Sequence, residues 1–172
     1  MTSRLNSLSP DLVRDMLAPE SASDVRVLLT LTSPELAQPI RVADGFTQRL
    51  SESGADVVYG VRSRGADFAF IPMVISLPTD LDSGTPRCQM TIHDVQRTLT
   101  PAIRTLSAPL TATIEVVSTA SPSVVEIEFP QFKLGAIQYS ADQITADLTV
   151  ESEAQEPFPA GLFTPVGFPG LF

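Results

Sequence analysis

The most regular feature of the sequence is the alternation of apolar and polar residues between residues 25 and 150. In the first such stretch, Val27, Leu29 and Leu31 follow Val25 on one side of the chain. A period of two is typical of half-buried β-strands. The pattern predicts about eight or nine strands, with the last ones forming an antiparallel meander. The later stretches are residues 40–43, 57–61, 68–77, 88–92, 110–117, 124–129, 132–139 and 144–150.

Two residues interrupt these stretches. Pro72 lies inside the strand predicted at 68–77 and removes a backbone donor, so we expect that strand to be an edge strand, bulged or broken in two there. Gly135 is expected at a β-bulge in the stretch 132–139.

Helical spacing occurs twice. Ser9 is a candidate N-cap and Pro10 suits the first helical position, so the sequence predicts a short amphipathic helix that ends before Pro19. Leu99 and Ile103 begin a second helix that ends at Ala108-Pro109, with a proline in its first turn.

The order of strands, helix and strands indicates a mainly β fold, an antiparallel β barrel or sandwich with two short helices and an extended C-terminal arm. Three regions are expected. Residues 1–24 are an N-terminal helix and linker, residues 25–153 the β domain, and residues 154–172 a Pro/Phe-rich arm.

Composition narrows the classes of function. The chain has 172 residues and a net charge of -9, so general attraction to nucleic acid or anionic lipid is disfavoured. Its apolar runs are too short for a membrane helix, and residues 1–17 do not have the pattern of a secretion signal. We therefore expect synthesis in the cytoplasm. Cys88 is the single cysteine, which excludes a disulfide within the chain and a cysteine-based zinc cluster.

Catalytic and metal-binding patterns are weak. His93-Asp94 suggests a Ser/His/Asp hydrolase, but the sequence has no G-x-S-x-G motif. Residues 80–84 resemble half of a calcium loop without the later carboxylates, and we interpret them as a turn. We expect neither an enzyme nor a bound cofactor or metal.

Two groups of charged residues are candidate surface features. Arg62, Arg64 and Arg87 could form a basic spot that contacts a partner's carboxylates, although a solvated loop is the default interpretation. Glu126 and Glu128 share one face of a predicted strand, and we expect both to face solvent.

The arm at residues 154–172 departs most from an ordinary domain. It holds four of the fifteen prolines, four of the nine phenylalanines and a single charged side chain, Glu156. Prolines at this density exclude a helix, and burying the rings alone does not offset the entropy lost on ordering the segment. We therefore expect the arm to dock in a preformed groove, on a neighbouring subunit rather than on its own domain. The expected interface residues are Pro157, Phe158, Pro159, Phe163, Pro165, Phe168, Pro169, Gly170, Leu171 and Phe172.

Several stretches resemble an uncharacterised domain family encoded in the tail-gene clusters of siphophages and prophages, similar to minor tail or distal tail proteins. The most specific is the arm motif PFPxxxFTPxxFPGLF at residues 157–172. The others are residues 32–42, 70–80, 92–99 and 124–127.

The resemblance implies a tail-tip or distal-tail component similar to β-barrel domains that stack as hexameric rings between tube, tape measure and hub proteins. It implies a virion location and no active site. The alternative is a β-sandwich module that binds a host-surface carbohydrate or receptor. Such sites usually expose Trp or Tyr, whereas this chain has no Trp and only Tyr59 and Tyr139.

Overall fold

The computed structural model describes residues 8–54, 56–76, 87–93, 99–140 and 142–149. Within these ranges the chain forms ten strands and two short helices, so the prediction of a mainly β chain is confirmed. The elements are α1 (Pro10–Leu17), β1 (Val25–Thr32), β2 (Ile40–Ala43), β3 (Gln48–Ser53), β4 (Asp56–Ser63), β5 (Ala66–Phe70), β6 (Met73–Ile75), β7 (Arg87–Ile92), α2 (Leu99–Arg104), β8 (Thr111–Ser118), β9 (Val125–Tyr139) and β10 (Ile144–Thr149).

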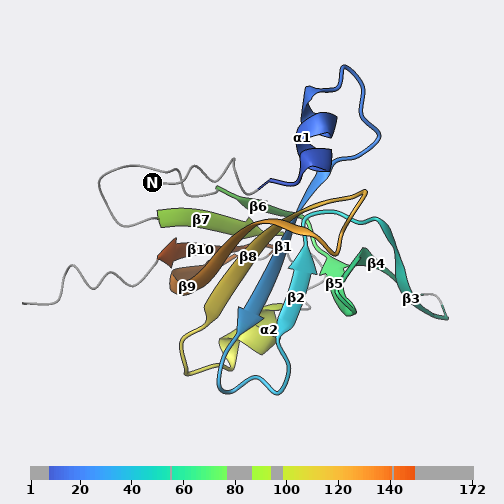
Figure 1. Ribbon diagram of the computed structural model, residues 1–172. Coiled ribbons are helices and arrows are strands. Elements are labelled where there is room, and N and C mark those ends of the chain that lie inside the picture. Colours follow the sequence, from blue (N-terminus) through green and yellow to red (C-terminus); the bar gives the residue numbers. More distant parts are fainter. Residues whose placement is uncertain (1–7, 55, 77–86, 94–98, 141, 150–172) are drawn as a thin grey trace, which may run out of the picture.

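The ten described strands form one curled, open half-barrel sheet (Figure 1). Its strand order is β3-β4-β5-β2-β1-β8-β9-β10-β7-β6, so β3 and β6 are the two edges. β2 and β5 pair in parallel, and the other described neighbours are antiparallel. The predicted meander is confirmed for β8, β9 and β10.

Apolar side chains are buried on both faces of the central strands. Leu28 and Leu29 are adjacent in β1, point to opposite faces and are both completely buried. The larger core contains Leu29, Leu31, Val42, Met73, Cys88, Met90, Ile92, Leu99, Ile103, Leu110, Ala112, Ile114, Phe129, Phe132, Ile144, Ala146 and Leu148. The smaller core contains Leu28, Ala43, Val61, Phe68 and Val117.

Both helices begin as the sequence predicts. The Ser9 side chain accepts a hydrogen bond from the Leu12 N–H and caps α1. α2 packs on the larger core through Leu99 and Ile103. No helix in the described part of the chain is long and apolar enough to span a membrane.

Pro72 breaks the strand predicted at 68–77, which was one of the three expected outcomes. β5 ends at Phe70 and β6 begins at Met73, and in the sheet order β5 is third from one edge whereas β6 is the opposite edge. The break is held in place at both sides, since the Ile71 N–H donates to the Ala43 carbonyl and the His93 N–H to the Pro72 carbonyl.

Two details of the strands differ from the prediction. The segments expected at 124–129 and 132–139 form one strand, β9, because bulges absorb the irregular positions. Gln131 and Ala136 have positive φ angles at these bulges, so the second bulge falls beside Gly135. β3 was not predicted, because five of its six residues are exposed and its sequence lacks an apolar alternation.

Gly60 generates a stability prediction. A Cβ atom at this position would lie 2.0 Å from the Phe68 carbonyl oxygen, on the paired strand β5. We expect Gly60→Ala to lower the free energy of unfolding by about 2 kcal/mol or more, because the two backbones must separate. Urea denaturation measures the change. Gly135→Ala is the control, since its Cβ would meet only the Asp147 carbonyl oxygen at 4.0 Å, and equal losses for both variants would contradict the prediction.

Candidate functional site

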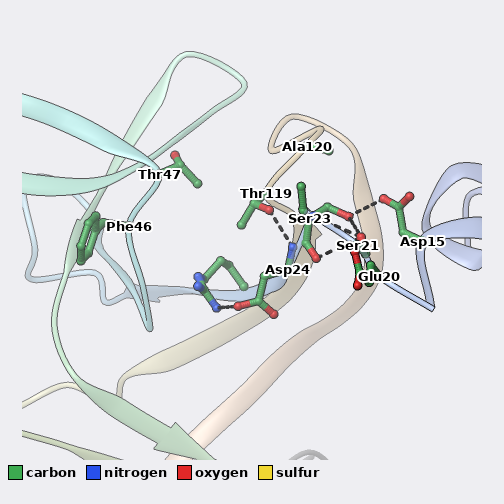
Figure 2. A pocket seen from close by; sticks show the side chains of 11 residues that line it. Asp15, Glu20, Ser21, Ser23, Asp24, Phe46, Thr47, Thr119 and Ala120 are labelled. Atoms are coloured by element: carbon green, nitrogen blue, oxygen red, sulfur yellow. Dashed lines mark hydrogen bonds and ion pairs between the residues drawn. The ribbon is translucent and has the colours of Figure 1, made fainter. Parts of the chain in front are cut away.

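A hollow in the described surface lies where three connections meet, as Figure 2 shows. These are the α1–β1 linker, the β2–β3 loop and the turn between β8 and β9. The hollow has a volume of about 680 Å³. Its lining residues are Asp15, Glu20, Ser21, Ala22, Ser23, Asp24, Arg26, Phe46, Thr47, Thr119 and Ala120.

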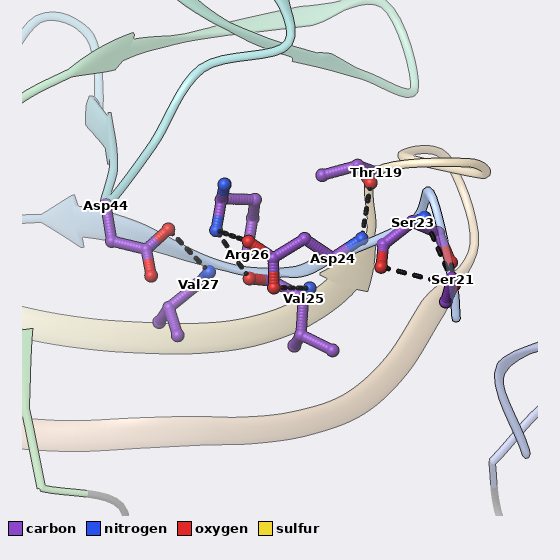
Figure 3. Close-up of polar contacts among 8 residues, drawn as sticks. All are labelled: Ser21, Ser23, Asp24, Val25, Arg26, Val27, Asp44 and Thr119. Atoms are coloured by element: carbon purple, nitrogen blue, oxygen red, sulfur yellow. Dashed lines mark hydrogen bonds and ion pairs between the residues drawn. The ribbon is translucent and has the colours of Figure 1, made fainter. Parts of the chain in front are cut away.

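An ion pair between two lining residues, Asp24 and Arg26, borders this hollow. Arg26 Nη1 lies 2.6 Å from Asp24 Oδ2 and also donates to the Val25 carbonyl (Figure 3). The Val25 N–H donates to the Asp24 carboxylate and, together with Arg26, lowers the pKa of Asp24 below its ordinary value. The Arg26 side chain rests on Gly45, where a Cβ atom would come within 2.3 Å of Nε. A side chain at position 45 would therefore displace the guanidinium from its present place.

The linker that borders the hollow is tied down by short polar contacts. The Asp24 N–H donates to Thr119 Oγ1, and the Thr119 N–H donates to the Asp24 carbonyl. The Ser23 hydroxyl donates to the Asp15 carboxylate at the end of α1. These contacts hold α1, the linker and the β8–β9 turn in one arrangement.

Asp44 extends the pairing of β1 with β2 beyond the end of β2. Its carboxylate accepts from the Val27 N–H at 2.9 Å, and its own N–H donates to the Val27 carbonyl (Figure 3). Partial burial raises the pKa of Asp44, and the Val27 N–H only partly opposes this shift. Asp44 therefore has a structural role, because its two hydrogen bonds continue the ladder between β1 and β2.

The chemistry of the hollow is that of a weakly anionic surface. Arg26 neutralises Asp24, and Asp15 and Glu20 leave two negative charges. Among the described residues, no group of three or more His, Cys, Asp or Glu side chains could hold a metal ion. The serines of the linker form hydrogen bonds with Asp15 and with each other, and the lining residues include no histidine. The arrangement suits contact with a basic side chain better than nucleophilic chemistry.

A second hollow of about 410 Å³ lies over β6, β7 and β10 and is lined by Ser76, Cys88, Gln89, Asp147 and Thr149. Burial raises the pKa of Cys88 to about 11, so its thiol stays protonated and unreactive at neutral pH.

Glu126 corrects an expectation from the sequence. It was expected to face solvent, but it is only 3% exposed. Its carboxylate accepts the Ser9 N–H at 2.7 Å and the Ser9 hydroxyl at 2.8 Å, which attaches the N-terminus of α1 to β9. A negative charge at this end of a helix is favourable, because the first N–H groups have no partner within the helix. Glu128, on the same strand, is exposed as expected.

The three arginines of the predicted basic spot do not gather. Arg87 belongs to β7, far from the other two in the strand order. Arg62 forms a two-bond pair with Asp67 across the β4–β5 hairpin, at 2.6 and 3.1 Å. Arg64, at the tip of this hairpin, lies 2.5 Å from the buried Glu115 of β8.

Arg64 relieves a repulsion in the sheet. Glu115 and Glu128 lie directly opposite each other on β8 and β9, a like-charge pair that destabilises a sheet. The hydrogen bond with Glu115 raises the pKa of Arg64, and Glu128 adds to the shift through its charge. The Arg64 N–H also donates to Ser123 Oγ, so the hairpin tip is attached to the β8–β9 turn. Arg64 and Gly65 form the two-residue turn of this hairpin, and both have the positive φ angles that such a tight turn requires.

Beside the hollow, three aromatic rings gather on the β3–β5 part of the sheet. Phe46 is 54% exposed and Tyr59 is 47% exposed, with ring centroids 5.4 Å apart. Phe70 lies 5.4 Å from Phe46 on the other side and is half-buried. The sequence did not single out this aromatic cluster, because its members come from a loop and two strands.

The ten interface residues predicted in the arm lie outside the described residues, as do residues 80–84 and Asp94. His93 is described at the end of β7, where its backbone N–H donates to Pro72. No model of a known protein family matches the chain, and no curated protein sequence matches it either.

The carboxylate of Glu126 should contribute to stability. We expect Glu126→Ala to lower the free energy of unfolding by about 1 to 3 kcal/mol, because the Ser9 donors lose their acceptor and α1 loses its attachment. Hydrogen exchange of the α1 amides should be faster in the variant than in the unchanged chain, whereas exchange of the β8 amides should change little. Glu128→Ala is the control on the same strand, with a change of about 0.5 kcal/mol or less. Unchanged exchange in α1 after Glu126→Ala would contradict the role assigned to this carboxylate.

Proposed function

We propose that this chain is a structural component of a phage tail, in the tail tip or distal tail ring that joins tube, tape measure and hub proteins. In this proposal the arm docks on a neighbouring subunit, the subunits form a hexameric ring, and the protein is made in the host cytoplasm before it enters the virion. The sequence motifs described above, the arm motif above all, support the assignment to a tail.

The observation that carries the proposal is the number of large apolar side chains left exposed in regular elements. Leu17 and Met16 of α1 are 80% and 63% exposed, and Val74 of the edge strand β6 is 66% exposed. Together with the uncharged rings of the arm, they provide apolar surface that an assembly would bury. A protein that functions through subunit contacts has use for such surface, whereas an isolated domain gains nothing from it.

The charge of the chain supports the same setting. A net charge of -9 disfavours binding to phosphates. A negatively charged ring around a DNA channel would let DNA pass without adhering to the wall.

Deletion of residues 154–172 tests the proposal. We expect the shortened chain to keep its circular dichroism spectrum and thermal unfolding midpoint, because described residues between 28 and 148 already form two apolar cores. We expect it to be lost from purified phage particles produced in a complementation assay, as measured by mass spectrometry of the virions. Normal incorporation of the shortened chain would overturn the proposed docking.

The aromatic cluster favours a second candidate function, a module that binds a host-surface carbohydrate. Exposed rings such as Phe46 and Tyr59 can stack on the apolar face of a sugar. A glycan array with the full chain tests this candidate. It predicts saturable binding that falls about tenfold or more in Tyr59→Ser and stays within about twofold in Val74→Ser, which lies at the far edge of the sheet. Absence of saturable binding would exclude it.

A further inference from the structure

We propose that the arm docks by strand addition: its residues 166–168 pair antiparallel with the edge strand β6 of a neighbouring copy of this chain. The inference rests on the proposed function and names the surface that receives the arm. It follows from the two edges of the sheet, from the backbone orientation of β6 and from the positions of the prolines in the arm.

The two edges of the described sheet differ in their protection. β3 is polar, carries an Arg49–Glu52 ion pair at 2.6 Å and has a register shift between Arg49 and Ser51. Charges and bulges are the usual devices that prevent a further strand from pairing with an edge. β6 is only three residues long and follows Pro72, but its residues Met73, Val74 and Ile75 are uncharged and pair with β7 without a shift. Of the two described edges, β6 is therefore the one more open to pairing.

Backbone hydrogen bonds show which groups of β6 face outward. Pro72 and Ser76 bond to β7, through the His93 N–H to the Pro72 carbonyl and the Ser76 N–H to the Gln89 carbonyl. Because bonding direction alternates along a strand, Val74 also faces β7, whereas Met73 and Ile75 present their N–H and C=O groups to the open edge. No described strand lies beyond them.

The prolines of the arm have a period that suits an edge. They occupy positions 157, 159, 165 and 169, all odd, so an extended chain would direct their missing donors to a single side. Even-numbered residues then keep every N–H on the other side, available to the partner strand. Three of the four phenylalanines and Leu162 and Val166 are even-numbered.

The faces of the two strands match as well. In an antiparallel hydrogen-bonded pair, opposed residues bond to each other and direct their side chains to the same face. Val166 and Phe168 would pair with Ile75 and Met73, whose side chains belong to or pack against the larger core. The odd-numbered prolines would lie on the face of Val74, which is solvent-exposed. Pairing would thus extend the larger core and leave the prolines outside.

The length of the chain favours a neighbouring copy over self-docking. β10 is separated from β6 only by β7, a distance of about 10 Å. Residues 150–165 would span about 50 Å as a proline-rich spacer. A spacer is most effective when its length matches the distance that it bridges. The spacer is about five times longer than the distance to the chain's own edge, which favours an acceptor on another subunit.

A pair of proline substitutions in the full chain tests the inference. Val166→Pro removes an N–H from the side that faces the acceptor strand, whereas Gly167→Pro removes one from the outer side. We expect self-association, measured by sedimentation equilibrium, to weaken about tenfold in Val166→Pro and to stay within about twofold in Gly167→Pro. Equal effects of the two prolines, or no effect of either, would overturn strand addition.

A second pair tests the acceptor. Val74→Lys places a charge on the β6 edge and should weaken self-association about tenfold, whereas Val58→Lys, at an exposed position of the non-edge strand β4, should change it by about twofold or less. Deuterium exchange at residues 73–75 should slow with increasing protein concentration and remain fast in Val166→Pro. Equal effects of the two lysines would overturn β6 as acceptor. Either failure leaves the proposed function intact, because that depends on virion incorporation after deletion of the arm.

Discussion

Burial of both faces of β1 and β8 is the constraint on which the rest of the structure depends. Leu28 and Leu29 point to opposite sides of the sheet and are both fully buried, as is Val117 of β8. A strand buried on both faces needs cover on both sides, and so much apolar surface is the main favourable contribution to folding. Strands β2, β4 and β5 cover the smaller core, and the strands beyond β8 curl around the larger core with α2. The curl of the open sheet follows from this double cover.

The outer elements are attached to this centre by polar contacts. Glu126 holds the start of α1, and Glu115 holds the tip of the β4–β5 hairpin through Arg64. Hydrogen bonds to charged groups are stronger than hydrogen bonds between neutral groups, so one such contact can attach an element without burying its apolar side chains. Some of these side chains stay exposed, such as Leu17 on α1 and Tyr59 on β4. This division between an apolar centre and polar attachments leaves apolar side chains on the surface of the outer elements.

Much of the fold could be predicted from the sequence, because period-two alternation reports a strand with one polar face. The alternating residues of β7 and β10 show this pattern. The start of α1 could also be predicted, because an N-cap serine followed by proline is a local signal. The polar edge strand β3 has no such pattern. Leu28 is buried by side chains of β2, β4, β5 and β8, which come later in the sequence. The burial of Glu126 and the pairing of Arg64 with Glu115 are likewise tertiary contacts. The aromatic cluster and the hollow beside it could not be predicted for the same reason, since their residues meet only after the sheet has curled.

The central ladder also determines how this chain must fold. β1, at Val25–Thr32, pairs along its whole length with β8, at Thr111–Ser118, so the strands at the middle of the sheet come from distant parts of the sequence. Chains dominated by such distant pairings fold slowly, because loop closure costs entropy before the contacts form. Until β8 arrives, β1 has an unpaired apolar side. During this delay the nascent chain is most exposed to aggregation, which binding by a chaperone would limit.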